Sequence, residues 1–92
     1  MDPKLAEIIR WLNERKVRAT YGAVAAVLGV RPQSMGARLG PHSLEASWIV
    51  NASTSLPTGY ESSEIHQDVR KSTELIRTGN ELRRKMRRNR GR

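Results

Sequence analysis

Residues 19–59 read ATYGAVAAVLGVRPQSMGARLGPHSLEASWIVNASTSLPTG, and this stretch predicts two short helices followed by a strand and a turn. The hydroxyl of Thr20 can cap the free amides of a first helix, which Gly29 then ends. A second helix is expected over residues 31–39, because proline stands in its first turn and Gly40-Pro41 breaks it afterwards. Two short helices joined at a glycine are typical of a helix-turn-helix.

Trp48-Ile49-Val50 is the best strand candidate in the chain, because aromatic and β-branched side chains favour strands. Residues 51–58 follow it and predict a wing. Their short hydroxyl and amide side chains can bond either to phosphate oxygens or to their own backbone. The expected fold is therefore mainly α: a small winged helix-turn-helix domain with a short β wing and a basic C-terminal helix or tail.

A helix is also predicted from Asp2-Pro3 to Arg15 or Lys16, with aspartate as its cap and proline in its first turn. Its apolar side chains recur at spacings of three and four residues, so they share one stripe of the helix. A chain of 92 residues can form one small domain with a modest core. We expect this stripe to be part of that core, and its members are Leu5, Ile8, Ile9 and Leu12.

The helix expected over residues 31–39 has one face that is nearly bare of bulk. That face carries Gln33, Ser34, Gly36 and Ala37, while Met35 and Leu39 can point inward. A face of small residues allows close approach to another surface. The helix is too short and too polar to span a membrane, so a nucleic-acid groove is the favoured partner. Tight packing against another protein helix is the alternative.

Four short pieces of this stretch resemble a known family. They are Thr20-Tyr21-Gly22 with Val24-Ala25 behind it, Met35-Gly36, the run Trp48-Ile49-Val50-Asn51-Ala52, and Ser55-Leu56-Pro57. Together they are similar to the C-terminal DNA-binding domain of the O6-alkylguanine-DNA alkyltransferases, and more closely to the alkyltransferase-like proteins. The resemblance implies a helix-turn-helix that enters the minor groove, with a tyrosine that pushes on a phosphate while a damaged nucleotide rotates out of the duplex.

The resemblance assigns roles to particular positions. Tyr21 falls on the phosphate-pushing tyrosine, and Gln33 falls where the family has the arginine that fills the gap in the base stack. The family signature Pro-Cys-His-Arg aligns with Glu45-Ala46-Ser47-Trp48, so Ala46 takes the position of the alkyl-accepting cysteine. Ala46, Ser47 and Trp48 would then line a vestigial base pocket. Trp48 either fills that pocket as part of the core, which we favour, or offers a stacking surface.

The composition changes after Gly59, so we expect a winged helix-turn-helix DNA-binding domain over residues 1–60 and a C-terminal extension over residues 61–92. Residues 1–69 hold 7 Lys or Arg and 7 Asp or Glu, whereas residues 70–92 hold 10 against 2. The net charge of +8 therefore comes from the extension. Thr78 and Glu81 have the spacing of a capping box, which predicts a last helix with Leu82 and Met86 on one side and arginines on the rest.

The chain lacks the usual signs of catalysis or metal binding. It has no cysteine, which excludes disulfides, thiolate metal sites and alkyl transfer to a cysteine. Neither His42 nor His66 has the partners expected of a general base or a metal ligand at useful spacing. We therefore expect no enzyme activity, no metal and no cofactor. The N-terminus has no signal pattern and no apolar run has the length of a membrane span, so a cytoplasmic, DNA-associated protein without membrane contact is expected.

Together these patterns predict a protein that binds double-stranded DNA without changing it. Two alternatives stay open: a sensor of damaged or modified bases that recruits repair proteins, and a module that holds an acidic protein partner. The expected DNA contacts are Thr20, Tyr21, Arg31, Gln33, Ser34, Gly36, Ala37, Arg38 and Asn51 in the domain, and Arg83, Arg84, Lys85, Arg87, Arg88 and Arg90 in the extension.

Overall fold

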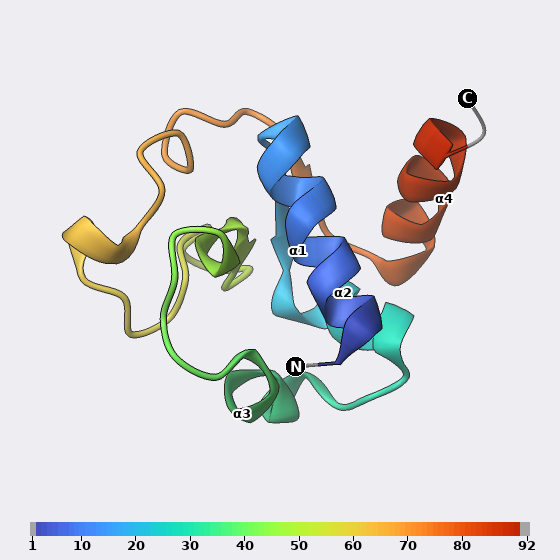
Figure 1. Cartoon of the computed structure of the whole chain (residues 1–92), viewed down its shortest axis with the longest axis horizontal. Coiled ribbons are helices and arrows are strands. Elements are labelled where there is room, and N and C mark those ends of the chain that lie inside the picture. Colours follow the sequence, from blue (N-terminus) through green and yellow to red (C-terminus); the bar gives the residue numbers. More distant parts are fainter. Residues whose placement is uncertain (1, 91–92) are drawn as a thin grey trace.

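The computed structural model describes residues 2–90, and side chains for residues 2–87. About half of the chain is helical, and a small three-stranded parallel sheet accompanies the helices (Figure 1). The helices are α1 (Pro3–Arg15), α2 (Tyr21–Leu28), α3 (Met35–Leu39) and α4 (Gly79–Arg90). The strands are β1 (Arg18–Thr20), β2 (Ile49–Val50) and β3 (Leu75–Ile76), and 3-10 turns occur at Pro32–Ser34, Ala46–Trp48 and Ser62–Glu64.

The sheet has the order β2-β1-β3, and both neighbours run parallel to the central strand. Ala19 lies in the middle of the sheet and pairs with Ile49 on one side and with Ile76 on the other. Parallel neighbours need long crossover connections, and helices and loops supply them here. The carboxyl ends of all three strands consequently lie at one edge of the sheet.

Helix α1 confirms the prediction for the N-terminal segment. An Asp2 carboxylate oxygen accepts a hydrogen bond from the Lys4 backbone N–H at 2.8 Å, and Lys16 ends the helix in the left-handed conformation at φ 59°. The predicted stripe is buried and forms part of the core, as Leu5, Ile8, Ile9 and Leu12 show.

The predicted pair of short helices is also present. Thr20 Oγ1 accepts from the Ala23 N–H at 3.0 Å, and Gly29 closes α2 at φ 74°. The second helix starts at proline and stops at Gly40, as expected, although its first turn is a 3-10 turn. Met35 and Leu39, at the two ends of α3, are buried, while the residues between them are exposed.

The C-terminal segment packs into the same hydrophobic core as the helices and strands that precede it. Strand β3 pairs with β1, and Leu82 and Met86 of α4 are buried. Gly79, at the start of α4, lies so close to α2 that a Cβ placed there would be 2.6 Å from the Cβ of Ala26. Figure 1 shows α4 beside α2 at one end of the molecule, with the loops between β2 and β3 at the other end.

The strands and loops differ from the prediction in several places. Residues 51–58 form turns and contain no strand, so the expected β wing is a loop. Trp48 belongs to a 3-10 turn, and the strand begins one residue later. A guanidinium from the central strand holds the two long loops: Arg18 donates to the Ser55 carbonyl at 3.0 Å and to the Ser72 carbonyl at 2.7 Å. These hydrogen bonds tie both loops to β1.

Candidate nucleic-acid interface

Helix α3 presents an exposed face with little side-chain bulk. Gly36 and Ala37 are exposed, and a Cβ added at Gly36 would meet no atom within 4 Å. Arg31 and Arg38 are exposed at the two ends of this segment. Ser34 Oγ accepts from Arg38 Nε at 3.3 Å and donates to the Arg31 carbonyl at 2.8 Å. The result is an open backbone surface with a cation at each end, which we call the α3 face.

A cavity of about 270 Å³ lies beside the α3 face. We call it the α3 cavity, and its lining residues are Tyr21, Pro32, Met35, Gly36, Leu39, Gly40, His42, Thr58 and Tyr60. The imidazole of His42 stacks on the Tyr60 ring with centroids 3.9 Å apart and planes at 22°. The Tyr21 hydroxyl accepts from the Thr58 N–H at 2.9 Å, which ties α2 to the loop after β2. The cavity therefore has an aromatic wall and several polar atoms at its edge.

Two titratable groups at this wall have shifted pKa values. Partial burial raises the pKa of the Tyr60 phenol above its ordinary 10.0, although a hydrogen bond from the Ser43 backbone N–H opposes the shift. Hydrogen bonds from the Glu61 backbone N–H and from the His42 ring lower the pKa of the Glu64 carboxyl below its ordinary 4.5. Glu64 Oε1 lies 3.0 Å from His42 Nδ1, so this carboxylate holds the imidazole against Tyr60.

A second, wider hollow opens where the three parallel strands end. Its volume is about 510 Å³, and it is lined by Thr20, Tyr21, Gly22, Pro32, Gln33, Asn51, Ala52 and Arg77. We call it the strand-end hollow. Arg77 follows β3 directly and supplies a cation there, while Asn51 Oδ1 accepts from the Ser53 N–H at 2.7 Å. Tyr21 and Pro32 line both spaces, so the hollow and the α3 cavity are adjacent.

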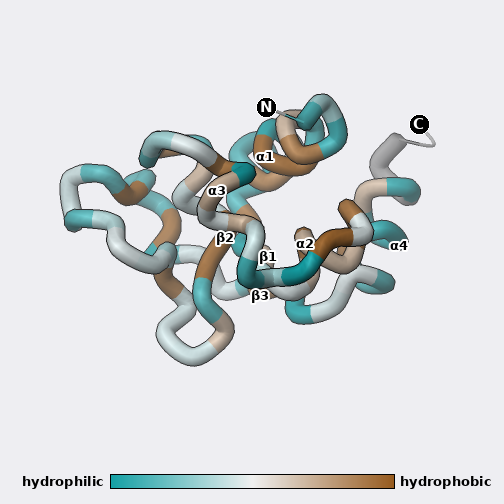
Figure 2. Tube along the Cα trace, turned by 90° about the horizontal axis from the view of Figure 1, so that it is seen from below, coloured by the Kyte–Doolittle hydropathy of each residue, from teal (hydrophilic) through white to brown (hydrophobic). Residues whose placement is uncertain are grey.

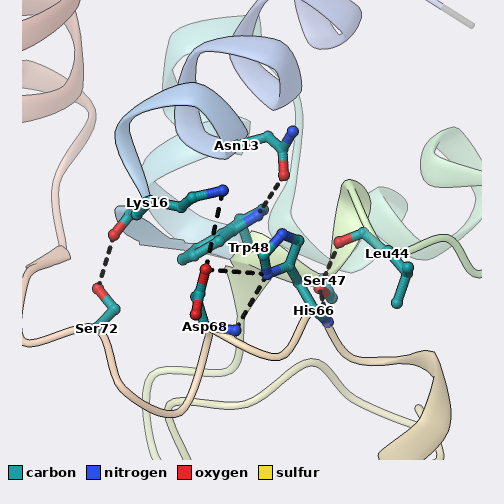
Figure 3. Close-up of polar contacts among 8 residues, drawn as sticks. All are labelled: Asn13, Lys16, Leu44, Ser47, Trp48, His66, Asp68 and Ser72. Carbon is teal, nitrogen blue, oxygen red and sulfur yellow. Dashed lines mark hydrogen bonds and ion pairs between the residues drawn. The ribbon is translucent and has the colours of Figure 1, made fainter.

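The residues expected to form a base pocket are instead part of the core. Ala46, Ser47 and Trp48 are buried, and none of them lines the α3 cavity or the strand-end hollow. Trp48 Nε1 donates to Asn13 Oδ1 at 2.9 Å, and Ser47 Oγ accepts from the His66 N–H at 2.9 Å (Figure 3). The interpretation of Trp48 as core is confirmed, because the side chain is fully buried.

The basic residues of α4 have different environments. Arg83 donates to the Ala26 carbonyl at 2.8 Å and to Asn80 at 3.2 Å, while Lys85 pairs with Glu74 at 2.7 Å. Arg84 and Arg87 are exposed. The side chains of Arg88 and Arg90 lie outside the described residues. Arg83 and Lys85 therefore already serve as contacts that hold α4 to the rest of the domain.

Comparisons with protein-family models, with curated proteins and with solved structures found no match for this chain. Within residues 2–90, no group of three or more histidine or acidic side chains is placed to hold a metal ion. None of the helices in this part of the chain combines the length and the apolar composition that crossing a membrane requires.

Sequence reasoning missed several residues of these two spaces. Arg77 lay in a segment without a predicted strand, although the apolar pair Leu75-Ile76 before it could have indicated one. Tyr60 lies beyond the last residue of the expected wing, and the sequence pattern around His42 bears only on a role as general base or metal ligand. Only the folded chain brings Tyr60 and His42 together.

Proposed function

We propose that this protein binds duplex DNA through the α3 face and does not change the DNA chemically. The observation that carries the proposal is the exposed, nearly side-chain-free surface at Gly36 and Ala37, with Arg31 and Arg38 at its ends. Such a surface lets the backbone of a helix approach the floor of a groove while the cations meet phosphates on either side. The sequence resemblance to alkyltransferase-like proteins independently favours the same face and its entry into the minor groove.

In this proposal, residues 20–59 act as a winged helix-turn-helix whose wing is the loop of turns after β2. Tyr21 and the strand-end hollow contact the backbone of the duplex, and Arg77 adds a cation next to Gln33 and Asn51. Three phosphate contacts by Arg31, Arg38 and Arg77 would give log affinity a slope of about −3 against log salt. Exposed Arg84 makes this slope steeper where it reaches a flanking phosphate.

The test is fluorescence-anisotropy binding of a labelled matched duplex at several salt concentrations. Gly36→Met fills the open space on the α3 face without touching the core, and it should weaken binding by about tenfold or more. Ser63→Met is the matched control, because Ser63 is also exposed but lines neither the α3 cavity nor the strand-end hollow. If both variants fold and bind the duplex like the parent protein, the α3 face is not the docking surface.

A second candidate function, sensing of a modified or extrahelical base, is favoured by the α3 cavity. An aromatic wall of Tyr60 and His42 can stack on a base that has left the duplex, and the adjacent hollow can hold its phosphate. The same assay distinguishes the two functions when one guanine of the duplex is replaced by O6-methylguanine. A preference above about tenfold, or 1.4 kcal/mol, supports sensing, and equal affinities with a steep salt slope support general DNA binding.

A further inference from the structure

A third concave surface lies away from the α3 face, between the start of α1, the end of α2 and α4. Its volume is about 270 Å³, and it is lined by Lys4, Val27, Arg83, Met86 and Arg87. We call it the α4 groove. The strands and α2 lie between α3 and α4 in both views of the molecule (Figures 1 and 2). A molecule in the α4 groove would therefore leave the α3 face free.

The lining of the α4 groove combines an apolar floor with cations at its edges. Val27 is half-buried and Met86 is buried, so Val27 supplies most of the small apolar surface of the floor. Lys4, Arg83 and Arg87 supply three positive charges, and Lys4 lies 3.7 Å from the Glu7 carboxylate on the same helix. The charge of the groove is positive even when that pair is taken as neutral.

The arginines of the α4 groove differ in how firmly they are placed. Two hydrogen bonds, to Asn80 and to the Ala26 carbonyl, fix the guanidinium of Arg83 at the end of α2 without neutralising it. Arg87 makes no hydrogen bond or ion pair with any residue that the structure describes, and it is exposed one turn further along α4. A ligand with a carboxylate would meet one preoriented cation and one that can adjust to it.

We propose that the α4 groove binds an acidic segment of a partner protein that carries one bulky apolar side chain. The carboxylates would pair with Arg83 and Arg87, and the apolar side chain would cover Val27 and Met86. A phosphodiester backbone complements only the charged part of this lining. Its phosphates can pair with the arginines, but it has no apolar group to cover the floor. This proposal does not depend on DNA binding, since the two surfaces share no residues.

The probe is a fluorescein-labelled peptide of glutamates with one central phenylalanine, and its control has alanine at the centre. The phenylalanine peptide should bind about tenfold more tightly than the alanine peptide. Arg87→Gln should weaken it several-fold, whereas Arg84→Gln, a loss of the same charge outside the α4 groove, should change binding less than about twofold. Val27→Asp should abolish binding by placing a carboxylate in the floor, and Arg87→Gln remains informative should that variant fail to fold.

Competition with unlabelled duplex DNA completes the test. A peptide that stays bound when the duplex is saturating supports a separate groove. Displacement by the duplex, together with lower duplex affinity in Arg87→Gln, would assign the groove to the DNA surface and overturn the proposal. Equal binding of the two peptides, or equal losses in Arg84→Gln and Arg87→Gln, would also overturn it, because either result reduces the interaction to nonspecific charge.

Discussion

Replacing Gly79 by alanine tests whether the start of α4 is fixed by its contact with α2. The added Cβ would lie 2.6 Å from the Cβ of Ala26 and 3.3 Å from the Ala23 carbonyl oxygen. The shorter distance is far inside van der Waals contact, and both neighbouring atoms belong to a helix that packs on the core. Helix α4 must therefore move away from α2, or α2 must deform.

The cost follows from two opposing effects. Overpacking in a well-packed region costs about 1–3 kcal/mol, while alanine favours a helix over glycine by at most about 1 kcal/mol. The expected net loss is about 1–2 kcal/mol in the free energy of unfolding. For a domain of 92 residues this lowers Tm by about 5–10 °C.

Thermal and urea unfolding, each followed by circular dichroism, measure the effect. Gly36→Ala is the matched control, because its Cβ would meet no atom within 4 Å and the same gain in helix propensity is unopposed. It should leave Tm unchanged or raise it. Ala26→Gly removes the nearest atom, so the double variant Ala26→Gly, Gly79→Ala should recover at least about 1 kcal/mol as a coupling energy.

An unchanged Tm in Gly79→Ala would refute this reasoning. It would mean that α4 can shift outward at no cost and that its position against α2 is not set by this contact. Loss of stability without rescue by Ala26→Gly would place the cause elsewhere in α4.

Two further predictions concern the loops. Arg18→Lys should lower the free energy of unfolding by about 2 kcal/mol in urea titrations, because an ammonium group cannot span the two loop carbonyls that the guanidinium bridges; an unchanged urea midpoint would contradict that bridge. The Glu64 carboxyl, whose pKa is lowered by the Glu61 amide and by His42, adds stability that is fully present above about pH 4.5 and is lost as the pH falls through its lowered pKa. Glu64→Gln should flatten that part of the stability-against-pH curve, and an unaltered curve would show that the pairing adds nothing.

The helices could be predicted because their ends depend on local chemistry. Asp2 and Thr20 each bond to an amide two or three residues ahead, and Gly29 and Gly40 take positive φ values that other residues resist. The buried stripe of α1 follows from spacing alone. Each of these signals involves residues only a few positions apart, so it can be recognised from the sequence alone.

The strands and the site depend on partners that are far apart in sequence. Strand β3 has two residues, and only its pairing with β1 distinguishes Leu75-Ile76 from any other apolar pair. The resemblance puts Trp48 at a pocket position, and the interpretation of this residue as core is confirmed by its burial, but its hydrogen bond to Asn13 of α1 could not be predicted from residues so far apart. The stacking of His42 on Tyr60 joins two loops and has no local signature.

The pairing of the central strand, β1, determines when the sheet can be completed during synthesis of the chain. Ala19 is synthesised 57 residues before its second neighbour, Ile76. Until then one edge of β1 has no strand beside it, and α2 lacks the helix that packs on it. A nascent chain that stops before Ile76 therefore carries an open sheet edge, which makes it a target for chaperones and a starting point for aggregation.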